Sequence, residues 1–155
     1  MPLWFYILTP LGWFSLYLTL VLLVHESGHL VVGLLTGHKI TKFKVGLCKP
    51  IVRFQIGSIP FELSLDSMGG SVSCDNTKHV SQIGIFLTAM AGPFAVLLLA
   101  TGVFLLIPEF SKQNYENETW QYFCQMILTA LSCVTYWIGL EGIVKDFKNI
   151  LVSKS

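Results

Sequence analysis

Three long runs of apolar residues dominate the pattern of this chain. They cover about residues 10–37, 82–107 and 119–144, and polar or charged residues gather between them. A helix that crosses a bilayer needs about 20 mostly apolar residues, because each residue advances the helix by roughly 1.5 Å. Each run reaches that length, and the apolar residues before the first run are too few for a fourth crossing. The pattern therefore predicts three transmembrane helices, the second ending at Pro108.

The segment between the first two runs has a different pattern. Apolar and polar residues alternate there in three short stretches, 43–46, 51–56 and 59–65. Such alternation is typical of strands with one buried face, and the Gly-Ser-Ile-Pro sequence at 57–60 is typical of a turn. We expect a small antiparallel sheet, a hairpin-like insertion over about residues 43–70, that ends at Met68-Gly69-Gly70.

Composition supports a membrane protein. Of the 155 residues, 53% are hydrophobic and 12% are charged, and the mean hydropathy is +0.65, whereas a soluble domain has about 25% charged residues. The formal net charge of +1 and the lack of a basic cluster among aromatic residues exclude a nucleic-acid partner. We expect an α-helical integral membrane protein that forms a single membrane domain over residues 1–155.

Lysine and arginine predict the orientation. Six basic residues lie between the first two runs and three follow the third run, whereas Lys112 is the one basic residue between the second and third runs. The positive-inside rule then places residues 38–81 and the C-terminus in the cytoplasm and the N-terminus outside. The first basic residue is Lys39, so the positive start of a cleaved signal peptide is missing. We expect a multi-pass protein of a bacterial plasma membrane.

The first run contains His25-Glu26-Ser27-Gly28-His29, which has the form HExxH. Residues four apart share one face of a helix, so both imidazoles can bind one metal ion. Glu26 lies beside them, where a carboxylate can take a proton from a metal-bound water. Ionisable side chains in a membrane helix are costly unless they are paired or bound to metal. The motif predicts a metal site with Glu26 as the catalytic base.

Two imidazoles, a carboxylate and a water form the usual catalytic zinc set, so we expect Zn²⁺, although non-haem iron uses similar ligands. The third ligand must come from elsewhere. We expect Glu141, the one acidic residue in the third run, because an isolated carboxylate in lipid is costly. Asp146 and Asp66 are the alternatives. Asp146 is expected at the water interface and Asp66 in a turn. The four cysteines have no CxxC spacing and are expected to be buried or reduced thiols.

These motifs together resemble the site-2 proteases, which are zinc intramembrane metalloproteases, over about residues 18–150. The resemblance rests on His25-Glu26-Ser27-Gly28-His29-Leu30, the segment from Val45-Gly46 to Gly69-Gly70, Ala91-Gly92-Pro93, and Leu140-Glu141-Gly142. It implies the minimal three-helix core of the family. It also implies that Glu141 stands where the family has its aspartate zinc ligand. Two departures bear on substrate positioning: Val96 replaces the family's asparagine after Gly-Pro, and the Asn-Pro usually found before the third-ligand segment is absent.

The predicted function is a zinc-dependent endopeptidase that cleaves a membrane-anchored protein or peptide near the cytoplasmic leaflet. The strand that ends at Gly69 and Gly70 is expected to hold an unwound substrate by edge addition. Gly92 and Pro93 are expected to leave room for substrate or water in the second helix, unless the proline only kinks that helix. The alternative is a catalytically degenerate metal-binding membrane protein that binds or escorts a membrane peptide.

Overall fold

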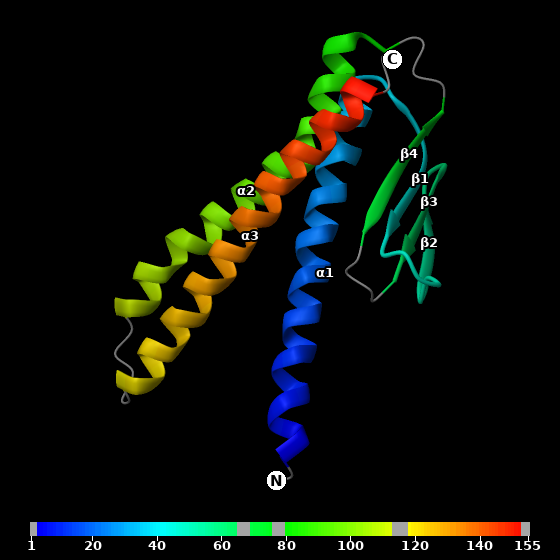
Figure 1. The fold of residues 1–155 in the computed structure, drawn as a ribbon. Coiled ribbons are helices and arrows are strands. Elements are labelled where there is room, and N and C mark those ends of the chain that lie inside the picture. The colour runs from blue at the N-terminus through cyan, green and yellow to red at the C-terminus, as the bar shows by residue number, and fades with distance from the viewer. Residues whose placement is uncertain (1–2, 65–68, 76–79, 113–117, 153–155) are drawn as a thin grey trace.

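A computed structural model describes the backbone of residues 3–64, 69–75, 80–112 and 118–152, and side chains within 12–64, 69–75, 80–105 and 125–146. Three long helices carry the fold (Figure 1): α1 (Leu3–Leu35), α2 (Gln82–Lys112) and α3 (Glu118–Val152). Helix α2 continues through Pro108, so the prediction that this proline ends the helix was wrong. Proline removes one backbone hydrogen bond, and the rest of the helix can tolerate that loss.

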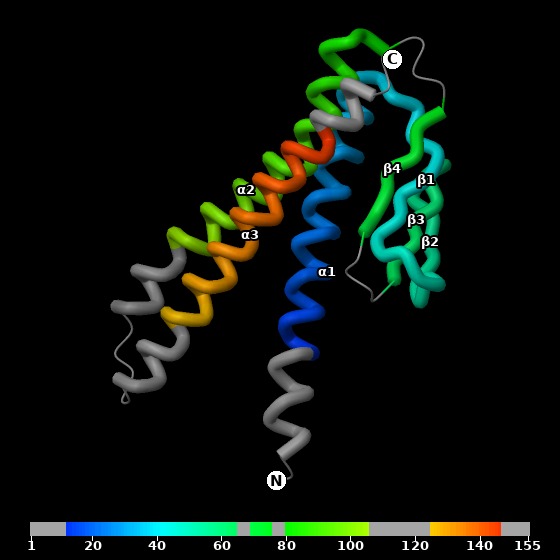
Figure 2. Tube along the Cα trace, viewed as in Figure 1, coloured from blue at the N-terminus to red at the C-terminus, as the bar shows by residue number. Residues whose placement is uncertain are grey.

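Helices α2 and α3 run side by side as an antiparallel pair over the parts coloured in Figure 2. Helix α1 packs on α2 near its own C-terminal end and diverges from the pair toward its N-terminal end (Figure 1). Tyr17 of α1 still reaches α3, where its hydroxyl hydrogen-bonds the hydroxyl of the fully buried Thr135. The three helices therefore converge at the end that carries the HExxH motif.

The sheet between α1 and α2 has four strands, β1 (Lys39–Val45), β2 (Val52–Ile56), β3 (Ile59–Leu63) and β4 (Gly70–Asp75), in the order β2-β3-β1-β4. The β2–β3 and β1–β4 pairs are antiparallel, but β1 and β3 are parallel. The predicted antiparallel sheet was therefore wrong for that pair. Gly70 begins a fourth strand instead of ending the sheet.

The sheet contacts α1 through β1 and β4. Three apolar side chains of β1 are buried: Ile40, Phe43 and Val45. Strand β4 is an outermost strand and is the one nearest to α1 in Figure 1. This places one edge of the sheet beside the face of α1 that bears the motif.

The helices expose large apolar side chains around most of their surface. Each has a stretch that is long and apolar enough to cross a membrane: Gly12–Leu35, Gln82–Leu105 and Gln125–Asp146. Leu20, Val31, Phe86, Leu98, Trp137 and Val144 are among the large apolar side chains with 44–73% of their surface exposed. In contrast, Val96, at the position of the family's asparagine, is completely buried.

Gly28 sets the distance between α1 and α2. A Cβ atom at this position would lie 2.5 Å from the backbone oxygen of Ala91. That distance is much shorter than a van der Waals contact. The Ala91 oxygen belongs to the backbone of a helix, so it cannot move aside as the end of a flexible side chain can. The second variable position of the HExxH motif, Gly28, therefore has to be glycine for the two helices to approach this closely.

We expect Gly28→Ala to lower the free energy of unfolding by about 1–3 kcal/mol, because overpacking would push α1 away from α2. Thermal unfolding in detergent measures this change. Gly12→Ala is the matched control in the same helix, since nothing lies within 4 Å of a Cβ added there, and it should be neutral or slightly stabilising. Equal stability of Gly28→Ala and Gly12→Ala would contradict the close approach.

Candidate metal centre

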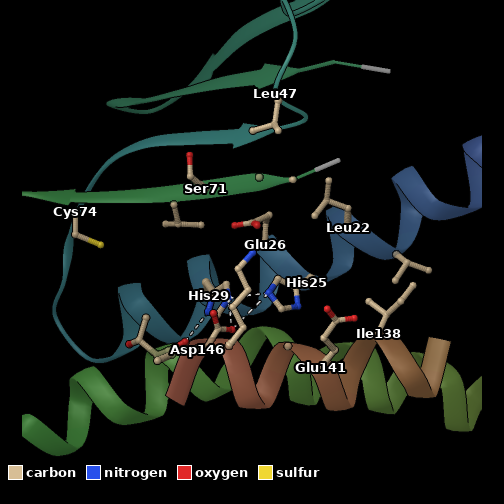
Figure 3. Close-up of a pocket in the computed structure, with 18 of the residues that line it drawn as sticks. Leu22, His25, Glu26, His29, Leu47, Ser71, Cys74, Ile138, Glu141 and Asp146 are labelled. Atoms are coloured by element: carbon tan, nitrogen blue, oxygen red, sulfur yellow. Dashed lines mark hydrogen bonds and ion pairs between the residues drawn. The ribbon is translucent and has the colours of Figure 1, made fainter. Parts of the chain in front are cut away.

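One cavity of about 910 Å³ lies where the three helices and β4 meet (Figure 3). Its α1 wall consists of residues at helical spacing: Leu18, Val21, Leu22, His25, Glu26 and His29. Positions i, i+3, i+4, i+7, i+8 and i+11 share one face of a helix. The whole functional part of the HExxH motif therefore faces the cavity.

Three ligand atoms converge in this cavity. The Nε2 atoms of His25 and His29 lie 3.1 Å apart, and Asp146 Oδ2 lies 3.7 Å from the first and 3.6 Å from the second. Within the described part of the chain, these three residues are the one group of histidine, cysteine or acidic side chains placed to share a metal ion. The group joins the C-terminal part of α1 to the C-terminal half of α3.

Zinc fits this arrangement. Metal–ligand bonds of 2.0–2.2 Å at tetrahedral angles separate neighbouring ligand atoms by about 3.3 Å, close to the distances found here. Asp146 Oδ2 is also buried and has no hydrogen-bond partner among the described residues. An unpartnered buried carboxylate oxygen is costly unless a cation meets it. The donor set of two imidazoles and one carboxylate leaves the fourth position open.

A backbone hydrogen bond orients His29. Its Nδ1 donates to the carbonyl oxygen of Thr88 in α2 at 2.7 Å. The proton is thereby held on Nδ1, which leaves the Nε2 lone pair directed at the other ligand atoms. The Thr88 hydroxyl in turn contacts the Thr36 hydroxyl at 3.0 Å, and Thr36 contacts Nδ1 of the buried His38 at 2.9 Å. This polar network connects the end of α1 to the outer side of the metal centre.

Each of the three motif side chains lies against a glycine of a different element. A Cβ atom on Gly142 of α3 would lie 3.2 Å from His25 Cε1, and one on Gly70 of β4 would lie 2.6 Å from Glu26 Cγ. A Cβ atom on Gly92 of α2 would lie 2.3 Å from His29 Nε2. The motif therefore fits into its surroundings because three neighbouring positions have no side chain.

The structure brings together some of the predicted site residues and separates others. His25, Glu26 and His29 lie together, and Glu141 lines the same cavity but lies outside the three-residue metal group. Asp146, which was expected at the water interface, is in that group because α3 continues beyond the predicted end at residue 144. Asp66 lies outside the described residues.

The four predicted substrate residues divide into two pairs. Gly69 and Gly70 line the cavity next to Glu26. Gly92 and Pro93 are buried between helices, Gly92 under His29 and Pro93 beside Gly142. Cys74 also lines the cavity as a free thiol. Burial raises the pKa of this thiol, which disfavours the thiolate that would bind metal.

One signal in the sequence identifies Asp146. Along α3, the residues that line the cavity are Ile138, Glu141, Gly142, Lys145 and Asp146. This is again the spacing of a single helix face. Asp146 follows Gly142 by one helical turn, just as His29 follows His25, so continuing the face past the apolar run would have found it.

The comparisons with known proteins agree with this geometry. The model of Peptidase family M50 matches residues 13–152. The chloroplast membrane metalloprotease ARASP of Arabidopsis thaliana is 31% identical over 68 residues, which cover 44% of this chain and 15% of ARASP. A protein named as a zinc metalloprotease in Chlamydia trachomatis is 31% identical over 113 residues, which cover 58% of this chain and 18% of that protein. The matches thus span less than a fifth of these relatives.

Apolar helices that surround two histidines and one aspartate placed to share a metal ion are typical of a membrane metalloprotease. The chain belongs to Peptidase family M50, the site-2 protease family. The resemblance found in the sequence is therefore confirmed, as is the metalloprotease class of the family.

We expect Gly92→Ala to weaken zinc binding about 10- to 100-fold, because its methyl group would occupy the space of the His29 ring. Zinc affinity measured by competition with a chromogenic chelator tests this. Gly102→Ala in the same helix is the control, since a Cβ added there meets nothing within 4 Å. Unchanged affinity in Gly92→Ala would show that His29 does not bind the metal in this rotamer.

Proposed function

We propose that the protein is a zinc-dependent intramembrane endopeptidase that cleaves a membrane-anchored protein or peptide. The observation that carries the proposal is the convergence of His25, His29 and Asp146 on one point, with Glu26 in the same cavity. Zinc would be held by His25, His29 and Asp146. Glu141, the ligand expected from the sequence, is the alternative that the experiment below tests. When bound, zinc would polarise the scissile carbonyl and acidify an attacking water.

Glu26 is the proposed general base and acid. It follows His25 directly and only 6% of its surface is exposed. The backbone of Gly70 in β4 lies against the Glu26 side chain. This contact restricts the Glu26 carboxylate to the cavity. From there Glu26 can accept a proton from the attacking water and pass it to the leaving amine.

Strand β4 is the proposed substrate cradle. One of its edges pairs with β1, and no described strand pairs with the other. Gly69, Gly70, Ser71 and Val72 line the cavity, so the beginning of the strand lies next to Glu26. A peptide bond inside a helix is shielded by its own hydrogen bonds. An unwound substrate added to the edge of β4 would present that bond in extended form.

We further propose that α1, α2 and α3 cross the bilayer. Their apolar stretches and exposed apolar side chains support this, and the relatives are named as membrane metalloproteases. The basic residues around the sheet support a cytoplasmic location for it and for the C-terminus, with the N-terminus outside. A bacterial plasma membrane is the proposed location. The metal centre then lies in the cytoplasmic leaflet.

Three variants test the catalytic assignment. We expect Glu26→Gln to lower kcat for cleavage of a model membrane peptide by about 10²–10⁴-fold, because the proton transfer is lost while the ligands remain. Its zinc content should equal that of the unaltered protein. Asp146→Asn should lose both zinc and cleavage, whereas Glu141→Gln should keep zinc. Metal analysis and peptide cleavage in detergent measure all three.

Two outcomes would contradict the assignment. Cleavage that persists in Glu26→Gln would show that Glu26 is not the general base and acid. If Glu141→Gln loses zinc and Asp146→Asn retains it, Glu141 and not Asp146 is the third zinc ligand. If the unaltered protein binds zinc but cleaves nothing, the degenerate peptide-binding alternative becomes the better function.

Topology can be tested with single cysteines. In a cysteine-free background, we expect a cysteine kept at position 48 to react with a membrane-impermeant maleimide only after cells are permeabilised. A cysteine introduced at Lys112, the last residue of α2, should react in intact cells, because that end of the helix is proposed to lie outside. The opposite labelling pattern would invert the orientation.

A further inference from the structure

The metal cavity contains a third histidine, which the metal centre does not use. His38 follows α1 and directly precedes β1, beyond the apolar span that ends at Leu35. Only 7% of its surface is exposed, yet it lines the cavity together with Thr88 and Cys74. A polar ring that is buried to this extent is costly unless both of its nitrogen atoms find partners.

The hydrogen bonds of His38 define which ring nitrogen carries the proton. The Thr36 hydroxyl donates within its own helix to the carbonyl oxygen of Val32 at 2.8 Å, so its single hydrogen is already used. Its oxygen therefore accepts at the 2.9 Å contact with His38 Nδ1, which bears the proton. Nε2 of the neutral ring is then an acceptor. Across the part of the chain that the structure describes, the hydrogen-bond contacts of His38 all involve Nδ1 and none involves Nε2.

The pairing of β4 with β1 shows which backbone groups of β4 face its open edge. Gly46 N donates to Gly69 O at 2.6 Å, in register with the antiparallel β1–β4 ladder. Hydrogen-bonded pairs recur at every second residue of such a ladder. Gly70 and Val72 therefore direct their backbone N–H and C=O groups away from β1. A substrate strand added to β4 would bond to these groups.

A substrate on this edge passes from Glu26 toward His38. Gly70, at the beginning of β4, lies against Glu26. Cys74, near the end of β4, pairs with Ile40, two residues after His38. Figure 3 shows the Glu26 and Cys74 side chains on the side of β4 that faces α1. Four residues of strand cover about 13 Å, so the substrate residue at the level of Cys74 is about four residues from the scissile bond.

Resting on the proposed function, we propose that His38 is a specificity-determining residue whose Nε2 accepts a hydrogen bond from a serine or threonine side chain of the substrate. The hydroxyl lies about four residues from the scissile bond, on the side proposed to face the cytoplasm. A hydroxyl fits because the neutral ring offers an acceptor and because Thr88, Cys74 and Ile85, which line the same cavity, are uncharged. An apolar substrate residue there would leave Nε2 without a donor.

Peptide binding tests this assignment without catalysis. In the Glu26→Gln background, membrane peptides carry serine, alanine or lysine at each position of the cytoplasmic flank in turn. We expect serine to bind about 10-fold more tightly than alanine at one position, because alanine leaves a buried acceptor unpaired. Zinc content, measured for each variant, reports whether the metal centre is intact.

Two substitutions separate the roles of the two ring nitrogens. The amide of asparagine can take the place of Nδ1 and donate to Thr36, but it is too short to replace Nε2. His38→Asn should therefore keep zinc and lose the serine preference. The longer glutamine can place its amide oxygen near the position of Nε2, so His38→Gln should retain the preference in part. Gln55→Leu, on the exposed strand β2, is the control and should leave the preference unchanged.

The outcomes separate this inference from the proposed function. A serine preference that is absent, that survives His38→Asn, or that lysine equals overturns the inference even if the protein cleaves peptides. Loss of zinc in His38→Asn also overturns it, because His38 would then act on His29 through Thr36 and Thr88. A preference that His38→Asn removes supports the inference even if the unaltered protein cleaves nothing, and the proposed endopeptidase alone would fail.

Discussion

The close contact between the HExxH helix and three glycines is the constraint on which the site depends. His25, Glu26 and His29 project from one face of α1 into a space bounded by α3, β4 and α2, and each side chain lies against a glycine of one of these elements. A methyl group at any of the three positions would require a ligand or the proposed base to move. The arrangement thus fixes the approach of three separate segments to a single helix.

A second set of contacts fixes the direction of one ligand. Thr88 uses its carbonyl oxygen to hold His29 and its hydroxyl to contact Thr36, which in turn contacts His38. Because His38 directly precedes β1, the same network ties the sheet to the outer side of the metal centre. The start of β1 and the orientation of His29 are therefore linked by one continuous group of polar contacts.

The sequence predicted the parts of the fold that local pattern controls. The apolar runs identified the three helices, and the four-residue spacing identified His25 and His29. Asp146 was assigned to the interface because the apolar run ends before it, although the helix does not. The parallel pairing of β1 with β3 was missed because it joins strands that are not adjacent in the chain. The strand at residues 70–75 was missed although its residues alternate between exposed and half-buried positions, and it is held in the sheet by pairing with the distant β1. Both errors concern long-range contacts.

The distance in sequence between the ligands has a consequence for biosynthesis. His25 and His29 are made before Asp146, so the complete donor set forms only after α3 has been synthesised and packed. Until then, the nascent chain holds two imidazoles without the third ligand. The proposed metal site is therefore complete only when α3 has joined α1 and α2.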